Sequence, residues 1–178
     1  MKPYKTFETQ RLLIKPIQVE DADFILELLN TEKFIHYIGD RNVRSIEDAV
    51  KYIQDKMLGQ LERLGFGNYA IIRKADQVRI GTVGLYDREG LYAVDIGFAF
   101  LPEYEHQGYA FESAQRILQA AFYDFNLEII CAITTNVNYA SQKLIQKLGL
   151  KYIGTTQIPN DDEELLLYEL KKTEYLSQ

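Results

Sequence analysis

The spacing of apolar residues predicts a chain that passes repeatedly between strands and helices. Strand-like apolar runs fall at about 11–16, 69–73, 78–86, 91–101, 128–135, 151–158 and 164–171. Apolar residues recur at helical spacing over about 20–30, 45–64, 107–125 and 140–148. Ser45 and Asp48 can form a capping box at the start of the second helix, which Gly65 ends. The predicted order is β-α-α-β-β-β-α-β-α-β-β.

The run at 91–101 separates bulky from small side chains. Tyr92, Val94, Ile96, Phe98 and Phe100 share one face, and Ala93, Asp95, Gly97 and Ala99 share the other. The nearly unbroken apolar run at 128–135 is typical of a central strand that is covered on both faces. A strand-helix-strand crossover joins the two runs and should be parallel and right-handed. We therefore expect an α/β (mixed α+β) fold, with antiparallel hairpins and a parallel crossover in one central mixed sheet covered by helices.

Composition narrows the class of protein. The chain has 178 residues and neither repeats nor a low-complexity linker, so we expect a single domain over 1–178. A formal charge of −6 disfavours non-specific nucleic-acid binding, and neither a membrane span nor a signal peptide is visible. The single cysteine, Cys131, cannot form an internal disulfide, so we expect it to be a core residue in a protein of the reducing cytoplasm. Two histidines and one cysteine supply few ligands, so we do not expect a structural metal site.

The segment with the clearest sign of a ligand-binding site is F-A-F-L-P-E-Y-E-H-Q-G-Y-A-F, residues 98–111. Here a strand ends, Pro102 stops it, and a short turn leads into a helix near Gly108. The first N–H groups of a helix lack partners and carry part of a positive charge, so a glycine turn at this point can cradle a phosphate. Taken alone, the segment is better explained as an ordinary strand-to-helix turn that a glycine makes easier.

The element order and several motifs together resemble the GNAT acyl-CoA N-acyltransferases, and most of all their RimJ/RimL-like branch. The motifs are F-A-F at 98–100, G-Y-A at 108–110, N-x-x-S at 138–141, T-x-R-L-L-I at 9–14 and K-L-G-L-K-Y-I-G at 147–154. The resemblance spans residues 7–170 and implies the GNAT fold, a central mixed sheet with helices on both faces. It also implies transfer of an acetyl group from acetyl-CoA to a primary amine by direct attack, without a metal.

The resemblance assigns cofactor-binding roles to two segments. The backbone amides that would hold the pyrophosphate belong to His106, Gln107, Gly108, Tyr109, Ala110 and Phe111. The strand backbone that would pair with the pantetheine arm belongs to Phe98, Ala99 and Phe100. Asn138 would hydrogen-bond this arm, and Ser141 would lie near the sulfur.

The sequence departs from the family pattern in two places. Glu105 stands where a glutamine or arginine usually opens the phosphate loop, and His106 stands where a glycine is common. A carboxylate beside a pyrophosphate is unfavourable unless it points away, and His106 can compensate by donating to a phosphate. Ile145 occupies the position of a tyrosine that serves many relatives as an acid, which leaves Ser141 or water to protonate the thiolate.

Asp95 is the candidate general base, because it is the single charge on the small-residue face and matches a carboxylate position of some relatives. A structural aspartate, with proton loss relayed by water, is the alternative. The candidate residues for lining the acceptor pocket are His36, Tyr37 and Tyr86. The alternative for His36 is a loop histidine whose hydrogen bonds are satisfied locally and which has no role in binding.

Two functions remain open at this point. The first is an N-acetyltransferase acting on a protein N-terminal α-amine, such as that of a ribosomal protein, or on a small amine. The second is a catalytically weakened CoA-binding sensor or interaction module. A nucleotide-phosphate binder is disfavoured because the chain has no G-x-x-x-x-G-K-[ST] loop. We expect no nucleic-acid or membrane partner, and a homodimer formed through the C-terminal hairpin is a further possibility.

Overall fold

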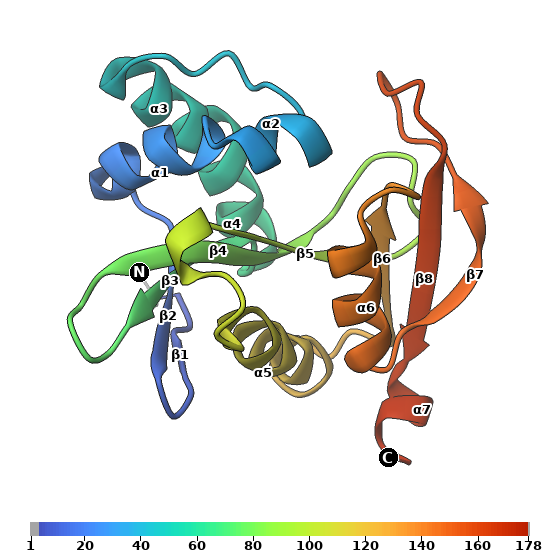
Figure 1. Cartoon of the computed structure of the whole chain (residues 1–178). Helices are drawn as coiled ribbons and strands as arrows, with labels where there is room; N and C mark the ends of the chain where they lie inside the picture. The colour runs from blue at the N-terminus through green and yellow to red at the C-terminus, as the bar shows by residue number, and fades with distance from the viewer. Residues whose placement is uncertain (1–3, 178) are drawn as a thin grey trace.

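A computed structural model describes residues 4–177, and its strands form one eight-stranded sheet in the order β1-β2-β3-β4-β5-β6-β8-β7 (Figure 1). The strands are β1 (Phe7–Glu8), β2 (Leu12–Pro16), β3 (Asn68–Arg73), β4 (Arg79–Tyr86), β5 (Val94–Phe100), β6 (Ile129–Thr134), β7 (Lys151–Thr156) and β8 (Leu165–Lys171). The α-helices are α1 (Ala22–Leu29), α2 (Glu32–Tyr37), α3 (Ile46–Tyr52), α4 (Gly59–Leu64), α5 (Tyr109–Tyr123), α6 (Tyr139–Lys147) and α7 (Lys172–Tyr175). The remaining helical segments are the 3-10 helices η1 (Val19–Asp21) and η3 (Pro102–Tyr104) and the π-helix η2 (Ile53–Leu58), which joins α3 to α4.

The sheet is mixed, as the sequence predicts. All neighbouring strands are antiparallel except β5 and β6, which are parallel and joined by α5. The β5–β6 register covers only Val94↔Ile130 and Asp95↔Cys131. Beyond this point β5 continues to Phe100 and pairs with β4 alone, whereas β6 continues to Thr134 and pairs with β8. The two parallel strands therefore diverge and leave a gap in the middle of the sheet.

Helices cover both faces of the sheet and enclose two apolar cores. On one face α5 and α6 contribute Ile117, Ala121 and Ile145 to a core with the sheet. On the other face α1, α2, α3 and η2 pack Ile25, Phe34 and further apolar residues into a second core (Figure 1). The predicted fold class is confirmed.

Two local predictions need correction. Residues 32–37 form α2 rather than a loop, because the Thr31 hydroxyl caps this helix by accepting from the Phe34 amide, 3.3 Å away. With Phe34 as its one buried residue, α2 gives no apolar periodicity. Strand β5 begins at Val94, so Tyr92 lies before the strand and is 61% exposed instead of sharing a core face. The short strand β1 and helix α7 had no clear sequence signal.

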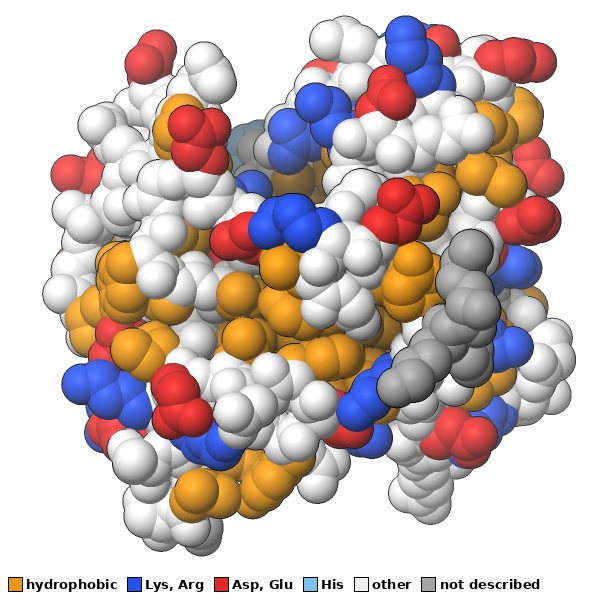
Figure 2. Space-filling view, turned by 180° about the vertical axis from the view of Figure 1, so that it is seen from behind, with side chains coloured by type: hydrophobic (Ala, Val, Ile, Leu, Met, Phe, Trp, Pro, Cys, Tyr) orange, Lys and Arg blue, Asp and Glu red, His pale blue; other side chains and the backbone are white. Residues whose placement is uncertain are grey.

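On the face opposite to the view of Figure 1, charge is spread out rather than gathered in one patch (Figure 2). Figure 2 shows acidic and basic side chains interspersed over the face opposite to the view of Figure 1, with apolar side chains between them. Within residues 4–177, no helix combines the length and the apolar character that crossing a membrane requires.

Candidate active site

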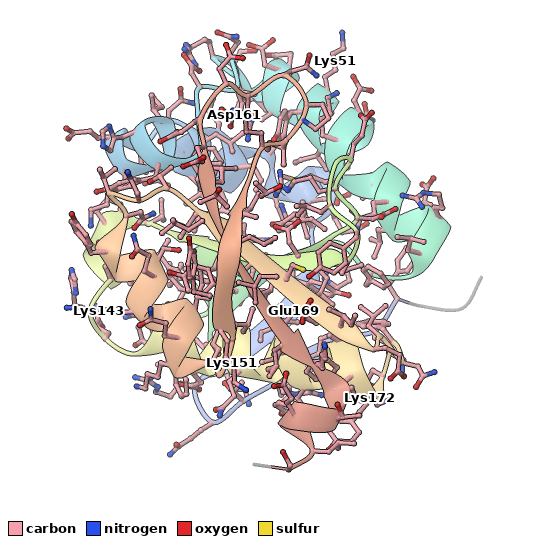
Figure 3. The ribbon with its side chains drawn as sticks, turned by 90° about the vertical axis from the view of Figure 1, so that its right-hand side faces the viewer. Lys51, Lys143, Lys151, Asp161, Glu169 and Lys172 are labelled. Atoms are coloured by element: carbon pink, nitrogen blue, oxygen red, sulfur yellow. The ribbon has the colours of Figure 1, made fainter. Side chains whose placement is uncertain are left out.

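A groove of about 980 Å³ runs along the diverging strands. The phosphate loop and α6 line one part of it, and α1, α2 and α3 line another. The tip of the β7–β8 hairpin, which carries Asp161, also contributes and lies at the same end of the molecule as Lys51 of α3 (Figure 3). The predicted site residues that line the groove are Tyr37, Tyr86, Asp95, Phe98, Ala99, Phe100, His106, Gly108, Tyr109, Ala110, Phe111, Asn138 and Ser141.

Two predicted residues lie outside the lining among the described residues. His36 is exposed on α2 and packs its ring edge-on against Tyr37, with the ring centroids 4.6 Å apart. Gln107 does not line the groove: its side chain donates to the Glu103 carbonyl at 2.9 Å, and its own carbonyl accepts from the Arg11 Nη1 atom at the same distance.

The phosphate loop leads from η3 into α5 through two left-handed residues, His106 (φ 56°) and Gly108 (φ 83°). In the described part of the chain, no group accepts a hydrogen bond from the backbone amides of residues 106–111. The first amide of the helix to find a partner is that of Glu112, which donates to the Gly108 carbonyl at 3.1 Å. These cradle amides (residues 106–111) are therefore free to donate to an anion at a helix N-terminus.

Two carboxylates flank the cradle amides, and each is paired with a cation from a distant part of the chain. Glu105 pairs with Lys33 of α2. Glu112 accepts from the Arg11 Nε atom at 2.6 Å and from the Thr9 hydroxyl at 2.5 Å. Burial opposes ionisation of Glu112, but these hydrogen bonds and the Arg11 charge hold its pKa below the ordinary value. Neither carboxylate therefore faces the cradle as an uncompensated negative charge.

The gap between β5 and β6 is bordered by the first turn of α6. The Asn138 Oδ1 atom caps this helix by accepting from the Ser141 amide at 3.2 Å, which leaves the Asn138 Nδ2 protons free to donate. Ser141 is half-buried in the groove wall. Ile145, one turn further along, is 1% exposed and brings no hydroxyl to the site.

Asp95 is 2% exposed and forms a two-pronged ion pair with Arg88 on the loop after β4. The Arg88 Nε and Nη2 atoms lie 3.1 Å and 3.3 Å from the two carboxylate oxygens. Burial raises the pKa of Asp95, and the Arg88 charge and hydrogen bonds oppose that rise. A raised pKa makes the ionised carboxylate a stronger base, which is the property that a general base requires.

Tyr86 lies against the sheet over two cross-strand partners, Gly84 and Gly97. A Cβ atom on Gly84 would come within 2.6 Å of the Tyr86 ring, and one on Gly97 within 2.9 Å. The Tyr86 hydroxyl donates to Asn68 Oδ1 at 3.1 Å. Burial, and then the Asp95 charge, raise the pKa of this phenol, which therefore stays protonated.

Sequence reasoning missed the cations of this site. Arg11 belongs to the T-x-R-L-L-I motif, which was a usable signal, whereas Lys33 and Arg88 have no pattern around them. Cys131 is fully buried and free, in line with the expected core role. Within residues 4–177, the histidine, cysteine, aspartate and glutamate side chains form no group of three or more that could hold a metal ion.

The chain is similar to known proteins in sequence and in structure. The family described as "Acetyltransferase (GNAT) domain" matches residues 11–151. The uncharacterized N-acetyltransferase YnaD of Bacillus subtilis is 29% identical over 146 residues, which are 82% of each chain. The ribosomal-protein-S5-alanine acetyltransferase from Vibrio fischeri superposes with a TM-score of 0.79 at 20% identity, covering 94% of this chain and 97% of that chain.

A structure of RimL, a ribosomal L7/L12 alpha-N-protein acetyltransferase in complex with coenzyme A, is also similar. It has a TM-score of 0.80 at 15% identity and covers 94% of this chain and 98% of that chain. These neighbours agree with the resemblance to the RimJ/RimL-like branch, and the family match favours an enzyme over a binding module. The chain belongs to the GNAT acetyltransferase family and is an acyl-CoA-dependent N-acetyltransferase.

Proposed function

We propose that this N-acetyltransferase acetylates the N-terminal α-amine of a protein, with acetyl-CoA as the acyl donor. The continuous groove, which leads from the cradle amides past Asp95 to the rim between the helices and the hairpin tip, carries this proposal. Its volume of about 980 Å³ is near the upper end of ordinary small-molecule sites and gives room for a donor arm and an acceptor chain. The names of the two ribosomal-protein acetyltransferases among the structural neighbours support the same acceptor class.

The residues of the groove fit acetyl-CoA. The cradle amides would bind the diphosphate, because their N–H groups lack partners at the positive end of α5. The β5 backbone from Phe98 to Phe100 borders the gap and would pair with the pantetheine arm, to which Asn138 Nδ2 would donate. When bound, acetyl-CoA supplies a thioester carbonyl that is activated toward a neutral amine.

The catalytic roles follow from burial and charge. Asp95 would take the proton of the acceptor amine, directly or through a water molecule, while Arg88 holds the carboxylate in place. The Ser141 hydroxyl would donate to the departing sulfur, because Ile145 offers no such group. Tyr37 and Tyr86 would line the acceptor side of the groove.

The experiment compares three acceptors at equal concentration with acetyl-CoA and a thiol reagent that detects released CoA. They are a peptide with a free N-terminus and no lysine, its N-terminally blocked counterpart with one lysine, and a polyamine. We expect CoA release and an acetylated α-amine, located by mass spectrometry, with the first peptide. Acetylation confined to the lysine peptide or the polyamine would contradict the proposed acceptor.

The homodimer and the cytoplasmic location stay predictions.

A further inference from the structure

The hairpin of β1 and β2 reaches the phosphate loop through Arg11, which lies 101 positions before Glu112 in the chain. The Arg11 Nη1 atom donates to the Gln107 carbonyl at 2.9 Å, and Nε donates to Glu112 at 2.6 Å. The Arg11 backbone amide donates to the same carboxylate at 2.9 Å, and the guanidinium lies over the Tyr109 ring, 4.4 Å from its centroid. The Arg11 side chain thus contacts Gln107 in the loop and both Tyr109 and Glu112 in the first turn of α5.

Arg11 lies behind the loop rather than in the groove. Gly108 and Tyr109 line the groove, whereas Arg11 is not among the described residues that do so. A Cβ atom on Gly108 would point toward Arg11 and lie 3.2 Å from its Nη2 atom. The guanidinium therefore contacts the rear of the loop.

The planar geometry of the peptide bond links this contact to ligand binding. In a trans peptide the carbonyl and the following N–H point in opposite directions, and the chain has no cis peptide bond among residues 4–177. Because Arg11 holds the Gln107 carbonyl at the rear, the Gly108 N–H must point away from Arg11, toward the groove side. Glu112, fixed by the same guanidinium, is also kept from the cradle.

We propose that Arg11 is a positioning residue for acetyl-CoA, which orients the cradle amides toward the diphosphate without touching it. The proposal rests on the cofactor role of the loop given above. A loop already fixed in its binding conformation loses less entropy when the ligand arrives, so the contact should appear as affinity for the diphosphate. Arg11 would leave the thioester end of the groove unaffected.

The alternative is that Arg11 only stabilises the fold, and the chain offers a matched control for it. Lys5 precedes β1 and pairs with Asp124 just after α5 at 3.0 Å, so it ties the same hairpin to the opposite end of the same helix. Lys5→Ala removes an exposed ion pair far from the cradle amides. Any effect that comes only from anchoring α5 to the hairpin should occur both in Lys5→Ala and in a variant that lacks the Arg11 guanidinium.

The test uses two acetyl donors, acetyl-CoA and S-acetylpantetheine, which carries the same thioester without the diphosphate. The variants are Arg11→Met, which keeps the stem over Tyr109, Arg11→Lys, which keeps the charge, and Lys5→Ala. We expect Arg11→Met to raise the CoA dissociation constant and the KM for acetyl-CoA about tenfold, equivalent to about 1.4 kcal/mol. Its kcat/KM with S-acetylpantetheine should stay within about twofold of the parent value, and Arg11→Lys should recover part of the affinity.

The outcomes separate the alternatives. Lys5→Ala should bind CoA like the parent chain, with thermal unfolding recorded for every variant. Equal losses with both donors in Arg11→Met, or unchanged CoA affinity, would overturn the positioning role and leave the proposed function intact. Failure of the parent chain to bind CoA would overturn both.

Discussion

Lys33 of α2 forms an ion pair with Glu105 at the start of the phosphate loop, although the two residues are 72 positions apart. Glu105 stands directly before the cradle amides, where a free carboxylate would repel a diphosphate. Lys33 neutralises this charge and at the same time ties α2 to the loop across the groove that both line. The departure of Glu105 from the family pattern is thus matched by a compensating cation elsewhere in the chain.

This pair predicts a charge-dependent affinity for CoA. Lys33→Ala should weaken CoA binding several-fold, because it leaves Glu105 uncompensated beside the cradle amides. Glu105→Gln should bind at least as well as the parent, and the double variant should return close to it. Isothermal titration at low and high salt checks this, because screening should reduce the loss in Lys33→Ala. A double variant as weak as Lys33→Ala would show that the lysine acts in some other way.

A second prediction concerns Gly108, where a Cβ atom would lie 3.2 Å from the Arg11 Nη2 atom. Gly108→Val should raise the CoA dissociation constant about tenfold or more, because φ is 83° and the branched side chain would displace the Arg11 contact.

Gly59→Ala is the matched control for Gly108→Val. Gly59 lies in α4, and a Cβ atom there would meet nothing within 4 Å. Helix propensity predicts that this variant is slightly more stable than the parent and binds CoA equally well. An unchanged CoA affinity in Gly108→Val would remove the loop from the cofactor site.

The third prediction follows from Asp95. A general base must be ionised, so activity should rise with pH through the pKa of Asp95, which burial raises. Asp95→Asn should lower kcat about a hundredfold or more and flatten the acidic limb of the pH–rate profile, with CoA affinity little changed. A profile that keeps its acidic limb would place the base elsewhere.

A substitution of Arg88 tests the same assignment, because it should shift the pKa of Asp95 in a known direction. Its charge favours the ionised carboxylate and lowers the pKa of Asp95. Arg88→Met should therefore raise this pKa further and move the acidic limb of the pH–rate profile to higher pH. A shift in the opposite direction would contradict the assignment of the limb to Asp95.

The sequence predicted those features that depend on local pattern. Alternation and helical spacing were enough for strands β2 to β8, α5, α6 and the parallel crossover, because each long element has an apolar face. Helix α2 was missed because its six residues bury one side chain. The pairs of Lys33 with Glu105, Arg11 with Glu112 and Arg88 with Asp95 could not be predicted, because they depend on how separate segments meet in the folded chain.

The glycine pair beneath Tyr86 gives the last prediction, which concerns the acceptor side alone. A methyl group on Gly97 would come within 2.9 Å of the Tyr86 ring, whose position on the sheet is fixed by its hydrogen bond to Asn68. Gly97→Ala should push the ring into the groove, lower kcat/KM for the acceptor several-fold and leave CoA affinity unchanged. Removing the ring in Gly97→Ala/Tyr86→Ala should relieve the clash, so the Gly97 substitution should cost less in that background than in the parent. Equal costs in both backgrounds, measured with saturating acetyl-CoA, would mean that Gly97 acts through the strand and not through Tyr86.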